Sequence, residues 1–314
     1  MFCARSCRSP LRLYVAYALS VSVMAALYVG AVAPSLSAPP EVEKGAAPWS
    51  MAHAAYSGRA ADISEQTDNA RATDFKPDGT RMYVVGRGSR NVAEYELSRA
   101  WDASSARFVQ ELKIDAPAAH GLFFNKENGR DMFVYNRRQI QQYKLAVPWD
   151  LATGERVKGK TLHCENVRLV RGHDIHIRAD GAKLYVEDRL NQEVYQYSLG
   201  TPWDVETLRW EATLDISDRQ RAVRGIELSP DGTRMWLMDT GRNEVLEYHL
   251  DEPWAVESAR FQRALDVSGT SSNSRGITWR ADGRAFYITS TGHQKVYEFS
   301  IPAADNNAGS EEER

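Results

Sequence analysis

Five residues that can each carry a positive charge occupy the same place in five similar segments of the chain. Each stands at the start of a short apolar segment, about 51 residues from the next; they are Arg71, His120, His173, Arg224 and Arg275. Copies of one unit arranged around an axis would bring all five to one end of that axis. Arginines gathered in a region of low dielectric bind carboxylates or phosphates through paired hydrogen bonds. The pattern therefore predicts a binding site for an anionic ligand.

The same arginines could instead serve only the fold, because repeated units descend from copies of one another. They could tie neighbouring units together through backbone carbonyls, or through Asp62, Asp215 and Asp266, which also recur. The two interpretations predict different results for replacing Arg224 and Arg275 with alanine. Anion binding would be lost in the first case, and the protein would unfold in the second.

A second group of polar residues follows the cationic positions by one or three residues. It consists of Asp74, Asp174, His176 and Glu227. Asp174 and His176 are two apart on an expected strand, so both point to the same side. An oxygen-rich set from three units suits Ca²⁺, Mg²⁺ or Mn²⁺. These four are candidate ligands for a divalent cation, with ion pairs to the arginines as the alternative; no other cofactor is expected.

Motifs of the common enzyme classes are absent from the sequence. It has no Gly-x-Ser-x-Gly, no His-Glu-x-x-His, no phosphate-binding glycine-rich loop and no Cys-x-x-Cys. Cys164, the one cysteine beyond the first seven residues, is expected to be a small packed side chain. The sequence thus favours a non-catalytic binding or scaffold role.

Two further markers repeat with the same period and reveal the elements that must position these residues. A turn signal recurs at Asp78-Gly79, Asn128-Gly129, Asp180-Gly181, Asp231-Gly232 and Asp282-Gly283. A tryptophan recurs at Trp49, Trp101, Trp149, Trp203 and Trp254, where it is expected to cap one end of each unit. Asp-Gly joins strands in tight hairpins because glycine accepts a positive φ. The chain is therefore predicted to contain five repeated β units.

Each unit is predicted to hold four short strands. An apolar segment such as 225–228 precedes the turn, a fully apolar run such as 235–238 follows it, and an alternating segment such as 245–250 comes next. Weaker segments such as 107–112 suit an outer fourth strand. Units of this size and content predict an all-β, five-bladed β-propeller with antiparallel blades. Residues 56–63 are expected to pair beside 295–301 and close the last blade.

The first unit carries a specific resemblance. Residues 75–84, Phe-Lys-Pro-Asp-Gly-Thr-Arg-Met-Tyr-Val, resemble the Asp-Gly-Thr-x-Met-Tyr repeats of bacterial and phage propeller proteins. More distantly, the chain resembles YVTN, NHL and lactonase-like propellers. The resemblance implies the fold and leaves the function open. The lactonase-like propellers imply an alternative function, a metal-dependent hydrolase with Asp74, Asp174, His176 and Glu227 at the mouth of the central channel.

The ends of the chain are predicted to lie outside the propeller. Residues 1–38 combine three arginines with a following apolar stretch, which predicts a hydrophobic helix that is either a cleaved export signal or a retained membrane anchor. Residues 39–54 are assigned to a linker, 55–302 to the propeller and 303–314 to a disordered tail. The propeller is therefore expected outside the cytoplasm, either periplasmic or secreted.

Composition excludes several classes of partner and of fold. The formal net charge is −3, which gives no support for nucleic-acid binding. Three cysteines cannot form a disulfide framework, so a buried core must hold the fold. The expected partner is an anionic small molecule or a protein. Membrane contact is expected only through the N-terminal segment, and the protein is expected to be a monomer.

Overall fold

The structure is a computed structural model that describes residues 47–136, 139–163 and 171–302. The predicted N-terminal helix, Cys164 and the predicted tail lie outside these ranges. Within them, no helix has both the length and the apolar character needed to cross a membrane.

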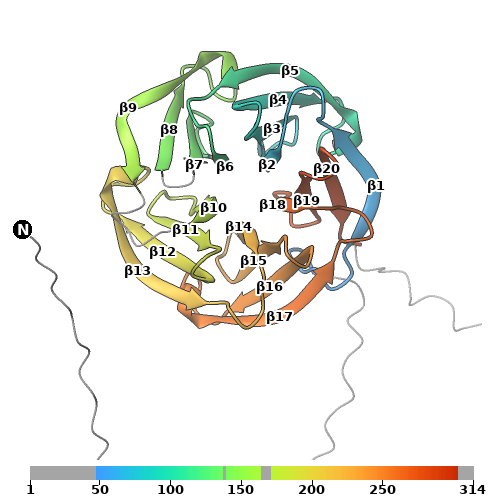
Figure 1. The fold of residues 1–314 in the computed structure, drawn as a ribbon, viewed down its shortest axis with the longest axis vertical. Coiled ribbons are helices and arrows are strands. Elements are labelled where there is room, and N and C mark those ends of the chain that lie inside the picture. The colour runs from blue at the N-terminus through green and yellow to red at the C-terminus, as the bar shows by residue number, and fades with distance from the viewer. Residues whose placement is uncertain (1–46, 137–138, 164–170, 303–314) are drawn as a thin grey trace, which may run out of the picture. The chain divides into compact units, whose positions relative to one another are not determined.

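Five four-stranded antiparallel sheets form a ring, which confirms the predicted five-bladed propeller (Figure 1). The innermost strands are β2 (Ala70–Phe75), β6 (Ala119–Phe124), β10 (Gly172–Ile177), β14 (Val223–Leu228) and β18 (Ser274–Trp279). The second strands are β3 (Arg81–Gly86), β7 (Asp131–Asn136), β11 (Lys183–Asp188), β15 (Arg234–Asp239) and β19 (Ala285–Ser290). The third strands are β4 (Asn91–Leu97), β8 (Gln139–Leu145), β12 (Glu193–Leu199), β16 (Glu244–Leu250) and β20 (Lys295–Ser300). The outer strands are β5 (Ala106–Lys113), β9 (Gly154–His163), β13 (Leu208–Asp215), β17 (Ala259–Asp266) and β1 (Ala55–Asp62).

The last blade is built from both ends of the propeller, as the sequence predicts. Strand β1 pairs antiparallel with β20, and Tyr56 lies opposite Phe299 while Asp62 lies opposite Lys295. In Figure 1 the blue β1 lies beside the red β20 at the outside of this blade. Because β18, β19 and β20 come from the far end of the chain, this pairing closes the ring.

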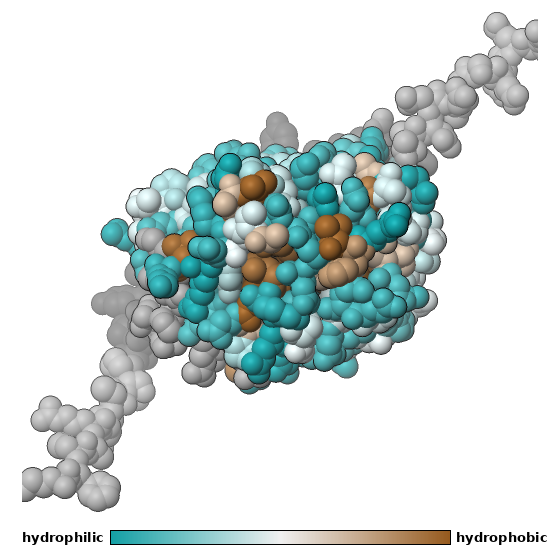
Figure 2. Space-filling view, turned by 90° about the horizontal axis from the view of Figure 1, so that it is seen from above, coloured by the Kyte–Doolittle hydropathy of each residue, from teal (hydrophilic) through white to brown (hydrophobic). Residues whose placement is uncertain are grey.

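Burial decreases from the second strands outward, which explains the hydrophobic patterns of the strands. Residues 82–85 of β3 are fully buried because both faces of the strand are covered. The outer strand β5 has only exposed and half-buried positions. The outer side of the ring is accordingly mostly hydrophilic, with isolated hydrophobic side chains (Figure 2).

Each recurring tryptophan packs on the Asp-Gly or Asn-Gly turn of its blade. The backbone N–H of Trp101 donates to the carbonyl of Gly79 at 3.0 Å, and a Cβ on Gly79 would lie 2.4 Å from the indole ring. Gly79 also has a φ of 73°, so glycine is required there for two reasons. The Tyr287 hydroxyl of the neighbouring blade donates to the Trp101 carbonyl at 2.6 Å. The tryptophans thus cap the turns, as predicted, and also contact the adjacent blade.

Buried acceptors on the third strands connect neighbouring blades. Glu298 of β20 accepts from the backbone N–H of Ala103, at the start of the short 3₁₀ helix η1 (Ala103–Ser105), at 3.3 Å. Glu94 accepts in the same way from Leu151 of the next blade at 3.2 Å. Equivalent bonds join Gln196 to Val256 and Glu247 to Met51. Each of these side chains satisfies a buried donor of the following blade, so blade-to-blade contact involves specific polar bonds as well as apolar packing.

Replacing Glu298 with alanine is expected to lower the free energy of unfolding by about 2 kcal/mol, because the Ala103 amide would be left buried without a partner. Glu298 is only 2% exposed and also bonds to Arg59 of β1. Glu298→Gln keeps an acceptor for the Ala103 amide, so its free energy of unfolding should fall by less than that of Glu298→Ala. Denaturant unfolding of these variants, with the exposed Glu257→Ala as control, measures the difference. Equal stability of Glu298→Ala and the control would contradict the proposed role.

Candidate functional site

The five predicted cationic residues lie at the starts of the innermost strands, and a β-bulge marks the same place in every blade. In β14 the step from Val223 to Ile226 spans three residues while the partner strand advances by two, from Asp239 to Leu237. The same irregularity occurs at the start of β2, β6, β10 and β18. A bulge inserts one residue and redirects side chains locally. This was not predicted, and it occurs where the cationic side chains leave the strand.

The cationic side chains come together at one end of the ring axis, which we call the cationic mouth. The rings of His120 and His173 are in edge-to-face contact, with centroids 4.6 Å apart. Arg71 and Arg224 lie in blades that are not neighbours, yet they interact electrostatically. The three arginines belong to consecutive blades around the ring, and the two histidines belong to the other two. The mouth therefore has an arginine side and a histidine side.

Burial and mutual repulsion disfavour positive charge in this cluster. Removal from water, followed by the repulsion of neighbouring arginines, lowers the pKa of Arg71 to about 10 and that of Arg224 to about 10. The same two causes lower the pKa of His173 to about 3. His173 is therefore neutral at physiological pH, and the arginines carry the positive charge.

Several N–H groups of the cluster are buried and have no hydrogen-bond partner among the described residues. They are Nε and Nη1 of Arg71, Nε and Nη1 of Arg275, and Nε of Arg224. Arg71 is 5% exposed and Arg275 is 9% exposed. An unpartnered buried donor is costly, and more so when it is charged. The arginine side of the mouth therefore offers charge and hydrogen-bond donors that this part of the chain does not use.

The aspartates that could have tied these arginines are engaged elsewhere. Asp62, Asp215 and Asp266 are exposed at the ends of the outer strands and accept from the backbone N–H of a serine two residues on. No ion pair between them and the ring arginines is present in residues 47–136, 139–163 and 171–302. The interpretation of the arginines as ties to these three aspartates is therefore not supported.

One residue after each cationic position, a layer of small residues lets the innermost strands approach one another closely around the axis. It consists of Ala72, Gly121, Asp174, Gly225 and Gly276. A Cβ on Gly225 would lie 2.5 Å from the carbonyl oxygen of Arg275, so the innermost strands meet backbone to backbone. Asp174 is the one polar member of the layer. Burial raises its pKa well above the usual value, and burial does the same for Glu187, which accepts from the Asp174 amide at 3.1 Å.

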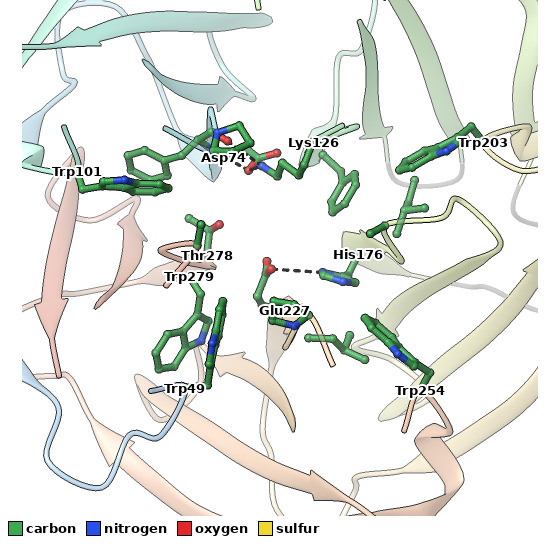
Figure 3. A pocket seen from close by; sticks show the side chains of 18 residues that line it. Trp49, Asp74, Trp101, Lys126, His176, Trp203, Glu227, Trp254, Thr278 and Trp279 are labelled. Carbon is green, nitrogen blue, oxygen red and sulfur yellow. Dashed lines mark hydrogen bonds and ion pairs between the residues drawn. The ribbon is translucent and has the colours of Figure 1, made fainter. Parts of the chain in front are cut away.

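At the other end of the axis lies a pocket with a cavity volume of about 240 Å³, which we call the tryptophan mouth (Figure 3). Its floor carries one residue from each innermost strand, and these are Asp74, Phe123, His176, Glu227 and Thr278. Its walls include Trp49, Trp101, Trp203, Trp254 and Trp279. The axis therefore has two mouths of different chemistry.

The polar groups on this floor differ in how far they are neutralised. Asp74 forms an ion pair with Lys126 and accepts from the backbone N–H of Phe124 at 2.8 Å. Glu227 faces Nδ1 of His176 at 3.4 Å, a contact drawn in Figure 3. Sequence reasoning missed Lys126, although it stands two residues before the Asn128-Gly129 turn, where Lys76, Arg178 and Arg280 stand in other blades.

The four predicted metal ligands are divided between two levels. Asp74, His176 and Glu227 line the tryptophan mouth, whereas Asp174 lies in the narrow layer. Lys126 occupies one carboxylate oxygen of Asp74. Among the described residues, no three His, Cys, Asp or Glu side chains are grouped closely enough to hold a metal ion. The divalent-cation site stays a prediction.

Comparison with known proteins finds similar chains among solved structures only. No family model matches it, and no curated protein matches its sequence. Among solved structures it is similar to a functionally unknown protein from Desulfotomaculum acetoxidans, with 12% identity over 71% of this chain and 63% of that one and a TM-score of 0.41. It is also similar to a proposed 6-phosphogluconolactonase from Bacteroides uniformis, with 11% identity over 68% and 61% of the chains and a TM-score of 0.44.

A third similar structure is the β-propeller domain of Cps50 (Swd1) from Myceliophteria thermophila. The identity is 10% over 74% of this chain and 84% of that one, and the TM-score is 0.48. The chain spans less than two thirds of the length of the first two structures. The likeness concerns the fold, and the resemblance to the Asp-Gly-Thr-x-Met-Tyr repeats stays a prediction.

His173 is expected to make the protein less stable in acid. Its pKa is about 3 in the folded protein, against about 6.5 in the unfolded chain, so between these values only the unfolded chain binds the proton. Lowering the pH from 7 to 5 should therefore cost about 2 kcal/mol through this residue. Denaturant unfolding at both pH values measures the loss, which His173→Asn should not show.

Comparing the wild type with His173→Asn cancels what other titratable groups contribute to the pH dependence of stability. The raised pKa values of Asp174 and Glu187 act in the opposite direction, because the folded protein holds those protons, and both residues are present in either protein. An equal loss of stability in the two proteins between pH 7 and pH 5 would contradict the assignment.

Proposed function

We propose that the propeller is a non-catalytic binding module that takes an anionic group at the cationic mouth, on the arginine side formed by Arg224, Arg275 and Arg71. One observation carries the proposal. All three arginines have buried N–H groups without a partner among the described residues, namely Nε of each and Nη1 of Arg71 and Arg275. A carboxylate, sulfate or phosphate would satisfy these donors and cancel the repulsion between the arginines.

The geometry limits the ligand to one that reaches into the mouth. Arg71 and Arg275 are more than nine-tenths buried, so a flat protein surface would not contact their inner nitrogens. A small anion, or an acidic side chain that projects from a partner protein, would. His173, neutral in the free protein, has an Nδ1 without a partner among the described residues and offers a further polar contact.

The location of the module is a separate part of the proposal. Residues 1–38 lie outside the described ranges, and their sequence of arginines followed by an apolar stretch supports export. An exported module would meet its anionic ligand in the periplasm or outside the cell, either free or held by an N-terminal anchor.

Inorganic sulfate is a suitable probe because it stays dianionic over the whole working range of pH. At a hundred times its Kd, sulfate should raise the free energy of unfolding of the wild type by about 2.7 kcal/mol relative to chloride at equal ionic strength. The double variant Arg224→Ala, Arg275→Ala should lose this stabilisation and keep only the general effect of sulfate on folding. Thermal and denaturant unfolding measure both.

The double variant also tests whether the arginines hold the fold. Because both guanidinium groups carry buried N–H groups without a partner among the described residues, the variant should be at least as stable as the wild type in the absence of sulfate. A matched double variant of exposed arginines on outer strands, Arg107→Ala with Arg209→Ala, should bind sulfate normally. Unfolding of the first variant would favour the structural interpretation and overturn the proposal.

A further inference from the structure

The tryptophan mouth has the composition of a site for an organic cation, which is the opposite charge to the ligand of the cationic mouth. Five indole rings stand around the pocket, and Glu227 lies near the middle of the opening (Figure 3). The face of an indole ring carries negative electrostatic potential and attracts cations. The walls and the carboxylate therefore favour the same sign of charge.

The floor of this pocket carries one negative charge that its internal ion pair does not neutralise. Asp74 and Lys126 neutralise each other as an ion pair. Glu227 has one ion-pair contact in the described part of the chain, with Nδ1 of His176 at 3.4 Å, and its side chain is 20% exposed. That contact does not meet the geometry of a hydrogen bond. Glu227 is thus the acceptor that the pocket leaves for a ligand.

The same molecule already uses its tryptophans to contact cations at the rim. The guanidinium of Arg178 lies 5.9 Å from the centre of the Trp254 ring, and that of Arg280 lies 5.9 Å from the Trp101 ring. Both arginines are neutralised by ion pairs, with Asp180 and Asp282. These two arginines therefore do not neutralise the negative charge of Glu227 inside the pocket.

The acceptors of the pocket distinguish between kinds of cation. A primary ammonium has three N–H donors and is strongly hydrated, so it needs several acceptors to replace water. Asp74 already accepts from Lys126 and from the amides of Phe75 and Phe124, which leaves Glu227 as the available carboxylate of the pocket. A quaternary ammonium has no N–H group, and its methyl groups pack directly against aromatic rings.

We propose that the tryptophan mouth binds a quaternary ammonium group, with the tryptophan rings as its walls and Glu227 as its counter-charge. This site is separated from the cationic mouth by the layer of small residues around Gly225. Its occupation therefore does not depend on the anion site, and either proposal can fail without the other.

Choline and its neutral carbon analogue, 3,3-dimethylbutan-1-ol, test the proposal on the unmodified protein. The two have the same shape, so the difference between them reports the effect of charge. Choline should bind saturably, and about tenfold or more tightly than the analogue, as judged by calorimetry and by tryptophan fluorescence. Equal binding of both compounds, or no saturable binding of choline, would overturn the proposal.

Variants then locate the site. Glu227→Gln keeps the shape of the side chain and should weaken choline binding about tenfold, a loss of about one Coulombic contact in a partly shielded site. The exposed Glu257→Gln should bind choline like the wild type. Unchanged choline binding by a folded Glu227→Gln variant would also overturn the proposal.

Two further outcomes separate this site from its alternatives. The double variant Arg224→Ala, Arg275→Ala should bind choline normally, and choline should not compete with sulfate. Competition between the two would place choline elsewhere and contradict the assignment.

Binding of a neutral sugar such as N-acetylglucosamine, with no binding of choline, would show that the tryptophan walls serve an uncharged ligand and would overturn the proposal.

Discussion

The pairing of β1 with β20 is the constraint on which the rest of the propeller depends, because it joins the two ends of the chain within one blade. Only a closed ring forces the five innermost strands together at the axis. Their approach is close enough that Gly225 and Gly276 could not carry a side chain without a collision. Buried bonds between blades, such as that from the Ala103 amide to Glu298, make the same junction specific. Closure, packing at the axis and polar contact between blades are therefore parts of one structural requirement.

This requirement creates two different sites from a single set of strands. Each innermost strand begins at one mouth, passes through the narrow layer and ends at the other mouth, so residues only three apart serve different sites. Arg224 belongs to the cationic mouth and Glu227 to the tryptophan mouth. Charges that would pair directly on an open surface are kept apart here, because the backbone contact around Gly225 stands between them. The ring can therefore hold unpaired positive charge at one end and an available carboxylate at the other.

The sequence predicted the blades, the closing strand and the end of the axis at which the cations gather, because all three depend on the period of the repeat. It did not predict the β-bulge at the start of every innermost strand, since these strands are largely buried on both faces and show no alternation that an extra residue would interrupt. From the sequence, we grouped Asp174 with Asp74, His176 and Glu227. Alternation along a strand shows to which face of the sheet a side chain points, but it does not show at which level along the axis that side chain lies. Lys126 was not singled out because basic residues also precede the turns of other blades, and only the folded chain shows that this one pairs with Asp74. The pairing state of Asp74 could be known only from the folded chain.

The repeat makes the ring symmetric in backbone but not in chemistry, and this asymmetry decides how a ligand would lie. Three consecutive blades supply Arg224, Arg275 and Arg71, and the other two supply His120 and His173. Burial lowers the pKa of His173 to about 3, so this residue adds no charge, and an anion is drawn toward the arginines. The tryptophan mouth is also uneven, because Trp149 is not among the residues that line it, while Lys126 and Asp74 neutralise one part of the floor. In both mouths, differences between copies of one unit, rather than the shared repeat, define where charge is available.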